Sequence, residues 1–478
     1  MTETHGTTLR RNAMGVPEMV FLVIAFAAPL AASTTNIPMA IGLGNGIGAP
    51  GTWLVVGLLL VLFSVGYTAM SRYISNAGAF YAYITAGLGR GLGVGAGYVA
   101  LIAYFSSVIL IGAFFGFFAS ATLDAELGIS VSWPVCSMIG LAAVFALCVL
   151  GVQASVRLLG VLLALETLLL VAIIVAVFVN VGPGEYPLRS FSPAEIFSGT
   201  PGVALAFVFS TFLGFEATAI FSEEARDPKR TVSRATYVAI AVIALLYLAA
   251  SWSAVAAVGA SDAVAVAAGD PGAMIFAIAG DNLGAWSSHA FNILIVTSLF
   301  AVLIAAHNSA SRYLFALARD GWLPHALSAT HRRYRSPHVA AVVQITISAA
   351  VVLAYAIAGA DPFTQLGATF VGMTTLGVVS LMVVVSIAVI GYFRKSGHAV
   401  GVWTSTIAPA ASALLLAITL VLIIDNFGLL TGSDSQVIAL LPLTLLVAVG
   451  LGFFVASRRR DQPPMVLDEV EEPALTAV

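Results

Sequence analysis

Two carboxylic acids inside apolar stretches are the side chains of this chain that most clearly suggest chemistry. Glu216 lies in LGFEATAI, two residues after Gly214, and Glu166 lies in VLLALETLLLVAII, with no other charged residue within several helical turns. A charge in such surroundings costs at least about 2.5 kcal/mol on insertion scales, so each group needs a partner or a proton. Both are therefore candidates to sense a substrate or to exchange a proton, and a neutral, hydrogen-bonded structural acid is the alternative for each.

Two interruptions of apolar stretches are the second chemical signal. In VFLVIAFAAPLAASTTNIPMAIGLG, Pro29 stands mid-run and is followed by hydroxyl side chains from Ser33 onward. Proline removes a backbone donor and breaks the helical ladder, and hydroxyls can cap a restarted helix. The N–H groups from Ala31 to Thr34 would then carry the positive end of a helix dipole and suit a substrate carboxylate. A kink filled by neighbouring helices is the alternative. Gly214 marks the second interruption.

The composition shows what must position these residues. Of the 478 residues, 60% are hydrophobic and only 9% are charged, and the mean hydropathy is +1.02. Soluble domains carry about 25% charged residues, so this composition indicates an all-α polytopic membrane protein. Cys136 and Cys148 are twelve residues apart in one apolar stretch, about 18 Å along a helix, and predict neither a disulfide nor a metal site. We expect no cofactor and no nucleic-acid partner.

The apolar runs long enough to cross a bilayer predict about twelve transmembrane helices. They lie near residues 17–43, 53–74, 94–119, 134–152, 158–180, 201–222, 236–258, 287–313, 338–358, 364–390, 402–424 and 436–456. Residues 1–16 are a polar N-terminus without a cleavable signal pattern, residues 17–456 form a single transmembrane domain, and the acidic tail of residues 457–478 is expected to be disordered.

Basic residues indicate the orientation of these spans. With the N-terminus in the cytoplasm, 19 of the 20 Lys and Arg residues fall in cytoplasmic segments, and Arg189 alone falls outside. Lys and Arg resist translocation, so this asymmetry predicts a multi-pass protein of the cell membrane with both termini in the cytoplasm.

The two interrupted runs are spans one and six, which head two sets of five spans. Paired interruptions at corresponding places are a pointer to a transporter site at the middle of the membrane. We therefore predict repeat one at about residues 17–180, repeat two at about 201–390, and two extra helices at about 402–456. Unwound backbone at that depth is tolerated where it lines a cavity.

The remaining motifs in the sequence do not indicate a nucleotide-binding or catalytic site. The glycine run from Gly87 to Gly97 has neither a flanking strand nor the GxxxxGK[ST] pattern, so close helix packing fits it better than a phosphate loop. The sequence carries no ATP-binding domain, no HExxH motif, and no Ser/His/Asp set at one depth. Enzyme activity is therefore not expected. His307 in span eight either supplements a proton path or joins helices by hydrogen bonds.

Two stretches resemble the amino acid–polyamine–organocation (APC) superfamily of permeases. FLGFEATAIFSEEARDPKRTVSRA, from Phe212 to Ala235, resembles its sixth-helix signature, and HNSASRYLFALARDGWLP, from His307 to Pro324, resembles its eighth helix and following loop. The resemblance implies a leucine-transporter-type fold, in which a five-plus-five inverted repeat is followed by two extra helices. It also implies a substrate held between helices one, three, six, eight and ten, largely by broken-helix backbone.

Carried onto this sequence, the first-helix motif of the family falls on Ala31 to Pro38, where two alanines and a serine replace its glycine-rich part and an extra proline, Pro29, lies just before it. The candidate substrate-binding residues are Pro29, Ala31, Ala32, Ser33, Thr34, Tyr104, Ser107, Ser210, Leu213, Gly214 and Glu216. Sodium-driven relatives of this fold use paired hydroxyls on helix eight, where this chain has Leu303 to Ala306. The candidates for proton coupling are Glu166, Glu216 and His307, and Glu166 lies near the place where some sodium-independent relatives have a lysine.

The sequence thus predicts a secondary transporter that moves an amino acid by alternating access, coupled to protons and independent of sodium. Its expected partners are a small-molecule substrate (an amino acid or amine), protons and the lipid bilayer. An amino acid or amine exchanger, or a polyamine or cationic amine importer, remains an alternative of the same fold. A channel or an intramembrane enzyme is the alternative from another class.

Overall fold

The structure is a computed structural model, and it describes residues 15–75, 80–150, 156–216, 218, 227–331, 336–398, 400–432, 435–459 and 468–469. Eight helical stretches among these residues are long and apolar enough to cross a membrane, or nine if the bent pair α12 (Ala263–Gly269) and α13 (Met274–Leu283) counts as one span. The chain is therefore a helical, polytopic membrane protein, as the composition predicts.

Each predicted span coincides with helical structure. The helices at these places are α1 (Val16–Ala27) with α2 (Pro29–Met39), α3 (Ala49–Met70), α5 (Arg90–Leu127), α6 (Trp133–Val149), α7 (Val156–Val181), α9 (Pro201–Ser210), α11 (Pro228–Val258), α14 (Ala285–Arg319), α15 (His338–Ile357), η7 (Pro362–Gly367) with α16 (Ala368–Ser396), η8 (Trp403–Ile407) with α17 (Ala408–Asp425), and α20 (Leu443–Arg458). Four of these helices, α1, α6, α9 and α20, are shorter than a full span. The number of twelve and the repeat boundaries stay predictions.

Shorter elements connect these helices. They are η1 (Ala40–Asn45), η2 (Gly46–Gly48), β1 (Ile74–Ser75), α4 (Phe80–Leu88), η3 (Pro183–Glu185), η4 (Leu188–Phe191), α8 (Pro193–Ile196), η6 (His325–Ser328), α18 (Phe427–Thr431), α19 (Gln436–Ala439) and β2 (Asp468–Glu469). α4, α12 and α13 were not predicted from the sequence. β1 pairs antiparallel with β2, which lies in the predicted disordered tail, and the rest of the chain beyond residue 459 falls outside the described residues.

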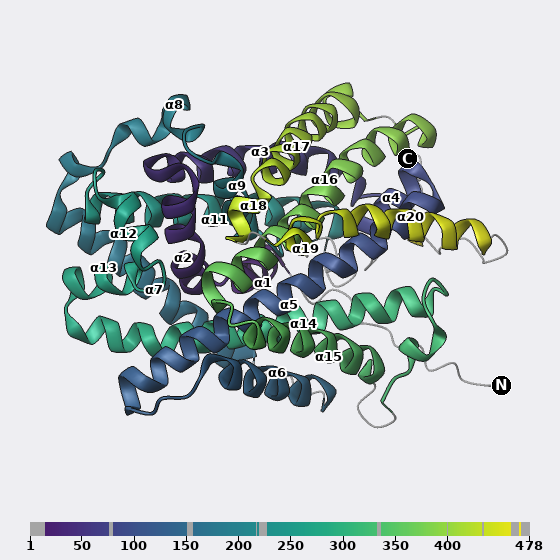
Figure 1. The fold of residues 1–478 in the computed structure, drawn as a ribbon. Helices are drawn as coiled ribbons and strands as arrows, with labels where there is room; N and C mark the ends of the chain where they lie inside the picture. The colour runs from purple at the N-terminus through teal and green to yellow at the C-terminus, as the bar shows by residue number, and fades with distance from the viewer. Residues whose placement is uncertain are drawn as a thin grey trace.

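The arrangement places α5 at the centre of the bundle (Figure 1). α5 packs against α14, α16, α6 and α20, and 78% of its most apolar window is buried, against 28% for α15. The glycine run helps this close packing, because a Cβ at Gly95 would lie 3.0 Å from the carbonyl oxygen of Val449 in α20.

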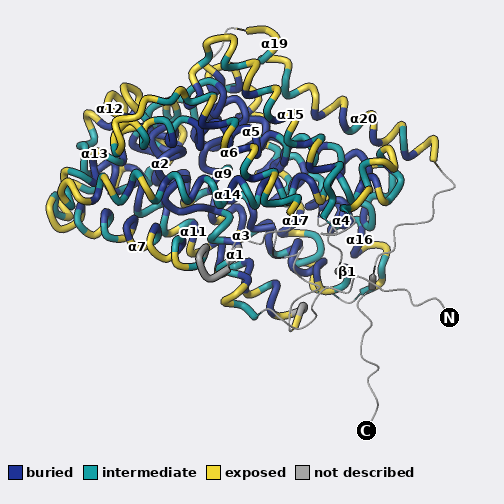
Figure 2. Tube along the Cα trace, turned by 90° about the horizontal axis from the view of Figure 1, so that it is seen from below, coloured by how far each residue is buried: buried dark blue, intermediate teal, exposed yellow. Residues whose placement is uncertain are grey.

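The outer helices carry exposed apolar side chains, as a hydrocarbon environment favours. In Figure 2, buried positions fill the centre and exposed positions lie on peripheral elements such as α7 and α20. On α7 the exposed apolar residues are Val161, Leu165, Leu168, Val171, Val175, Phe178 and Val179, and on α17 they are Leu414, Leu415, Ile418, Val421 and Ile424.

Candidate functional site

The first apolar span is broken at Ala28. This residue has φ +46° and ψ +76°, a left-handed conformation that separates α1 from α2. Pro29 is the first residue of α2, a position where the missing N–H of proline costs nothing. The ladder of α2 begins with the N–H of Ala32, which donates to the Ala28 carbonyl at 2.8 Å.

The second helix of this span, α2, begins at Pro29. Its start therefore lies before the segment from Ala31 to Thr34, whose N–H groups were predicted to be free. Thr34 and Thr35 donate back to the carbonyl oxygens of Leu30 and Ala31 at 2.8 and 2.9 Å. The interpretation of these hydroxyls as caps is therefore wrong. They lie too far inside α2 to reach its first turn, and they satisfy themselves on the preceding turn instead. The backbone donors that α2 leaves without an internal acceptor belong to Leu30 and Ala31.

The second break follows α9. Residues 211–216 form successive turns instead of a helix, and Gly214 has φ +94°. A side chain at Gly214 would be strained at this φ, and its Cβ would lie 2.5 Å from the ring of Phe26. Glycine is therefore required here both for its conformation and for its lack of volume. Residues 217 and 219–222, which complete the predicted sixth span, lie outside the described residues, as do residues 223–226 after it.

The two breaks lie side by side. Phe26, in the last turn of α1, contacts Gly214, and Ser210, at the end of α9, donates to the Oδ1 of Asn36 in α2 at 3.0 Å. α2 also packs against α9, α7, α11 and α14. The structure thus brings the two predicted interruptions together in the interior of the bundle.

The Glu216 carboxylate is held by this unwound backbone. It is 1% exposed, its Oε2 accepts the N–H of Gly214 at 3.0 Å, and its Oε1 accepts the hydroxyl of Tyr104 at 3.2 Å. A hydrogen bond from a backbone donor that the break has freed offsets part of the cost of burying the carboxyl group. Tyr104, Gly214 and Glu216 are all among the candidate substrate-binding residues, and these three residues are in contact.

Two tyrosines that the sequence analysis missed bind the breaks. Tyr247 of α11 donates its hydroxyl to the Ala27 carbonyl at 2.7 Å, and Tyr67 of α3 donates to the Glu216 carbonyl at 2.9 Å. Both tyrosines are buried. A buried tyrosine hydroxyl in a membrane helix needs a partner, and that need was the available signal.

The remaining candidates at the breaks are buried, with one notable hydroxyl. Pro29, Ala31 and Ala32 are buried in the first turn of α2. The Ser33 hydroxyl is fully buried and has no hydrogen-bond partner within the part of the chain that the structure describes. Ser107 donates to the Tyr104 carbonyl of its own helix at 2.7 Å. Leu213 is half-buried.

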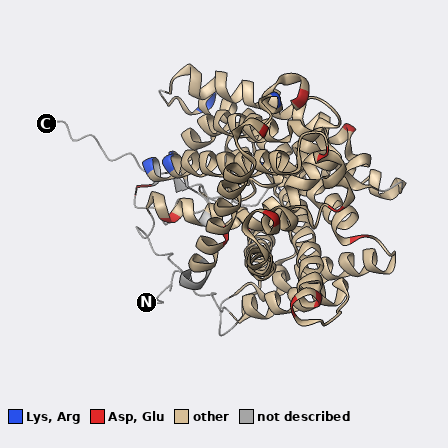
Figure 3. Ribbon diagram, turned by 90° about the vertical axis from the view of Figure 1, so that its left-hand side faces the viewer, with Lys and Arg blue, Asp and Glu red and all other residues tan. Residues whose placement is uncertain are grey.

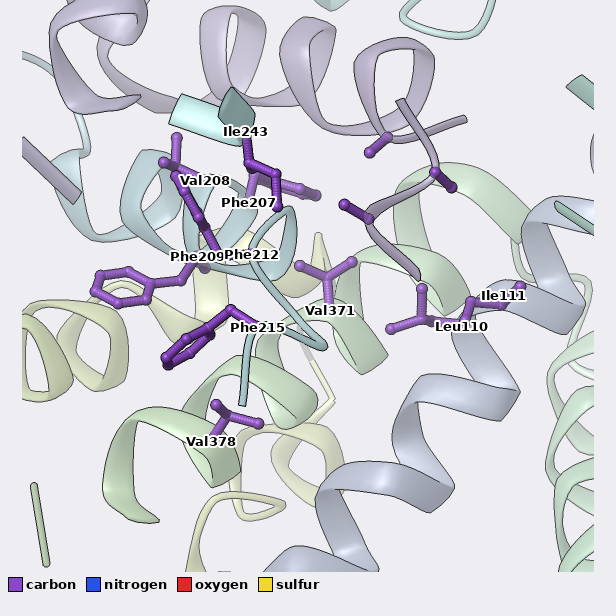
Figure 4. Close-up of a cluster of buried hydrophobic side chains, with 14 of the residues drawn as sticks. Leu110, Ile111, Phe207, Val208, Phe209, Phe212, Phe215, Ile243, Val371 and Val378 are labelled. Atoms are coloured by element: carbon purple, nitrogen blue, oxygen red, sulfur yellow. The ribbon is translucent and has the colours of Figure 1, made fainter. Parts of the chain in front are cut away.

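Aromatic and aliphatic side chains pack around the second break. Figure 4 shows Phe212 and Phe215 from the turns together with neighbouring side chains of α9, α5, α11 and α16. The rings of Phe63 and Phe215 meet edge to face with centroids 6.0 Å apart. This packing stabilises a segment whose backbone makes i→i−3 hydrogen bonds, except at Gly214, where the N–H binds Glu216 instead.

The three candidates for proton coupling lie in separate surroundings. Glu166 of α7 is 5% exposed. Ser298 of α14 and Tyr247 are its polar neighbours, yet its Oε2 has no hydrogen-bond partner among the described residues. His307 of α14 bonds through Nδ1 to Gln344 of α15, and Gln344 donates to Ser348 at 2.9 Å. His307 therefore joins helices, as one of its two interpretations holds, and Gln344 was not anticipated.

A separate hollow of about 680 Å³ lies between the end of α5, the start of α6 and η7. Its acidic side chains are already satisfied locally. Asp124 accepts the Ser130 hydroxyl at 2.7 Å, and Asp361 accepts backbone N–H groups at the start of η7. This hollow is not part of the site at the breaks.

The sequence model of a family described as amino acid permease matches residues 19–449, which is most of the chain. The chain belongs to the amino acid permease family, within the APC superfamily. This permease has the two adjacent helix breaks that the family resemblance implied.

Curated relatives of this permease are transporters. A branched-chain amino acid permease, BcaP, of Bacillus subtilis is 23% identical over 83% of this chain and 85% of its own length. BcaP of Lactococcus lactis is 24% identical over 76% of this chain and 80% of its own. A methylthioribose transporter of Bacillus subtilis is 28% identical over 72% of this chain and 73% of its own. This permease is accordingly a multi-pass membrane transporter of small molecules and not an enzyme.

Proposed function

We propose that this permease is a secondary transporter that carries an amino acid across the cell membrane by alternating access around the paired breaks. The observation that carries the proposal is the buried N-terminus of α2. Its preceding residue, Ala28, has no polar side chain that caps the helix. An uncapped helix N-terminus attracts an anion, and the α-carboxylate of an amino acid is such an anion.

Two further contacts support placing the carboxylate at the first break. The Ser33 hydroxyl lies one turn into α2, buried and without a hydrogen-bond partner among the described residues. At the second break, by contrast, the freed N–H of Gly214 is already taken by Glu216. Donors for a substrate carboxylate therefore belong to Leu30, Ala31 and Ser33, while the turns of residues 211–216 offer carbonyl groups for an amine.

Ligand-induced stabilisation tests this assignment. The purified permease is heated with leucine, isoleucine or valine, because two relatives are branched-chain amino acid permeases, and in parallel with leucinamide, which has the amine but no carboxylate. A ligand at a hundred times its dissociation constant adds about 2.7 kcal/mol of stability. The expected result is a shift with an amino acid and none with its amide. Equal shifts with leucine and leucinamide would contradict a carboxylate site.

A variant pair localises the site. Ser33→Ala should lower the apparent affinity for the amino acid about fivefold, as the loss of one hydrogen bond predicts. The affinity is obtained from the dependence of the melting temperature on amino acid concentration. Ser107→Ala is the matched control, because the Ser107 hydroxyl is buried but already donates to its own helix. An unchanged affinity in Ser33→Ala would remove this serine from the site.

We propose further that Glu166 couples transport to protons without sodium. Glu166 interacts electrostatically with Tyr247, whose hydroxyl binds the carbonyl of Ala27 at the first break. An ionised carboxylate places a negative charge that acts on the tyrosine hydroxyl, whereas a protonated carboxyl group carries no such charge. The protonation state of Glu166 is thus connected to the first break through one side chain.

Gradient-driven uptake into proteoliposomes tests the coupling. An inward-directed proton gradient, with the outside acid, should drive accumulation in the native permease with or without sodium. Glu166→Gln should abolish that accumulation and keep exchange of labelled for unlabelled amino acid. Glu185→Gln, in the exposed segment η3, is the control. Full accumulation in Glu166→Gln would exclude Glu166 from coupling, and exchange without any gradient effect in the native protein would favour the exchanger.

The methylthioribose transporter relative supports a second class of solute. Methylthioribose has hydroxyl groups and no carboxylate, so it would not need the α2 N-terminus. Stabilisation by methylthioribose that persists in Ser33→Ala would favour this second candidate over an amino acid.

A further inference from the structure

The two helix breaks are each capped by a tyrosine from the other half of the molecule. Tyr247 lies on α11, the helix that follows the second break, but it binds the Ala27 carbonyl at the first break. Tyr67 lies on α3, the helix that follows the first break, but it binds the Glu216 carbonyl at the second break. The two contacts are thus exchanged between the halves of the chain.

The two tyrosines occupy matching positions on their helices. Tyr67 lies about as far from Ala49, the first residue of α3, as Tyr247 lies from Pro228, the first residue of α11. α3 and α11 also pack directly against each other, and a Cβ at Gly57 would lie 2.8 Å from the Cβ of Ala244.

The contacts between the surrounding helices also come in pairs, one from each half of the chain. α11 packs against α1 and α2, as α3 packs against α9. α7 packs against α2 and α11, as α16 packs against α9 and α3. α5 packs against α15 as α14 packs against α6, and α5 packs against α14 itself. These contacts are therefore matched when spans one to five are exchanged with spans six to ten.

Both caps bind backbone carbonyl groups at the breaks. The Ala27 carbonyl would accept from Ala31 in a continuous helix, and the left-handed turn at Ala28 prevents this. The Glu216 carbonyl ends the run of turns at residues 211–216. A buried carbonyl without a partner is costly, so a donor at each point stabilises the broken form of the helix.

We propose that Tyr67 and Tyr247 are a symmetry-related pair of positioning residues, each of which holds open the helix break of the opposite repeat. Neither hydroxyl is required to touch the substrate. The pair sets the direction of the freed backbone groups at the breaks, and its effect on transport rests on the function proposed above. The capping itself does not depend on that function.

Hydrogen exchange in the purified full-length permease tests the caps without any substrate. Tyr247→Phe should speed amide exchange by about fivefold in peptides around residues 24–34, and Tyr67→Phe should do so in peptides around residues 211–216. Tyr83→Phe is the matched control. Tyr83 is equally buried, its ring lies 5.3 Å from that of Tyr67, and its hydroxyl bonds to Ser71 instead of to a break.

A crossed pattern supports the proposal: each variant loosens the distant break and not its own helix. Faster exchange only in the mutated helix, or equal effects in Tyr83→Phe, would overturn it. Transport adds a second measurement, in which Tyr67→Phe and Tyr247→Phe should raise KM several-fold while leaving the melting temperature within the range of Tyr83→Phe. If the native protein carries no amino acid, the proposed function fails, and the exchange pattern still decides whether the tyrosines cap the breaks.

Discussion

Gly214 shows how one residue serves several needs at once. Its positive φ turns the chain out of the helix, its missing side chain makes room for Phe26, and its freed N–H binds the Glu216 carboxylate. The pattern Gly-Phe-Glu in an apolar run was sufficient to predict the break and a buried carboxyl group that needs a partner there. The tyrosines at the breaks were not predictable in this way, because their partners lie more than a hundred residues away in sequence.

Replacing Gly214 by alanine should destabilise the protein through two separable effects. The left-handed conformation costs an alanine about 1–2 kcal/mol, and the new methyl group meets the Phe26 ring at 2.5 Å. We expect a lower melting temperature and loss of the amino acid-induced shift, both measured by thermal unfolding of the purified permease.

Two other glycines separate these effects. Gly128 has φ +66° with open space around it, so Gly128→Ala reports the conformational cost alone. Gly450 in α20 has open space and no positive φ, so Gly450→Ala should be neutral or slightly stabilising. If Gly214→Ala lowers the melting temperature no more than Gly128→Ala does, the contact with Phe26 does not contribute to the destabilisation.

At the scale of helices, the apolar runs predicted the position of every long helix among the described residues. They predicted the first and last residues of these helices less accurately. α5 begins before and ends after its predicted span, because a helix continues past the hydrocarbon without any change that a count of apolar residues detects. α4, α12 and α13 were missed because they are short, and short apolar segments have no length signal. Their residues were read as connections between spans.

A break in the first span was correctly predicted, but the start of the second helix was placed a few residues too late. Proline was treated as the interruption and the hydroxyls after it as the new start. In fact Pro29 is itself the start of α2, which the preference of proline for the first helical position explains. The interruption falls on Ala28, a residue type with no preference for a left-handed conformation, so the sequence contained no local signal for it.

At the scale of the whole molecule, charge supports the predicted orientation. Figure 3 shows most of the visible Lys and Arg segments toward one side of the view, while Asp and Glu are spread across it. From the positive-inside tendency, we expect that side to face the cytoplasm. The fold could be outlined this far from sequence because hydropathy and charge act on whole segments, whereas the site depends on contacts between segments.

Labelling of single cysteines tests the orientation. Cys136 and Cys148 are first replaced by alanine, and a cysteine is then introduced at an exposed position on each side. In intact cells, a membrane-impermeant maleimide should label Glu185→Cys, beside Arg189, and should not label His325→Cys until the cells are opened. The reverse pattern would invert the predicted topology, and labelling of both would contradict the number of spans between them.

The joint at Ala28 and Pro29 has a consequence for motion. Closing it into a continuous rod would bury the proline ring against the carbonyl of the turn before it, a clash worth about 3 kcal/mol. That interruption is therefore built into the covalent chain and should persist throughout a working cycle. Gly214 imposes no such obstacle, since glycine also accepts helical angles. The two breaks therefore differ. We expect the break at Pro29 to remain in every state of the transport cycle, whereas the backbone at Gly214 can adopt a helical conformation.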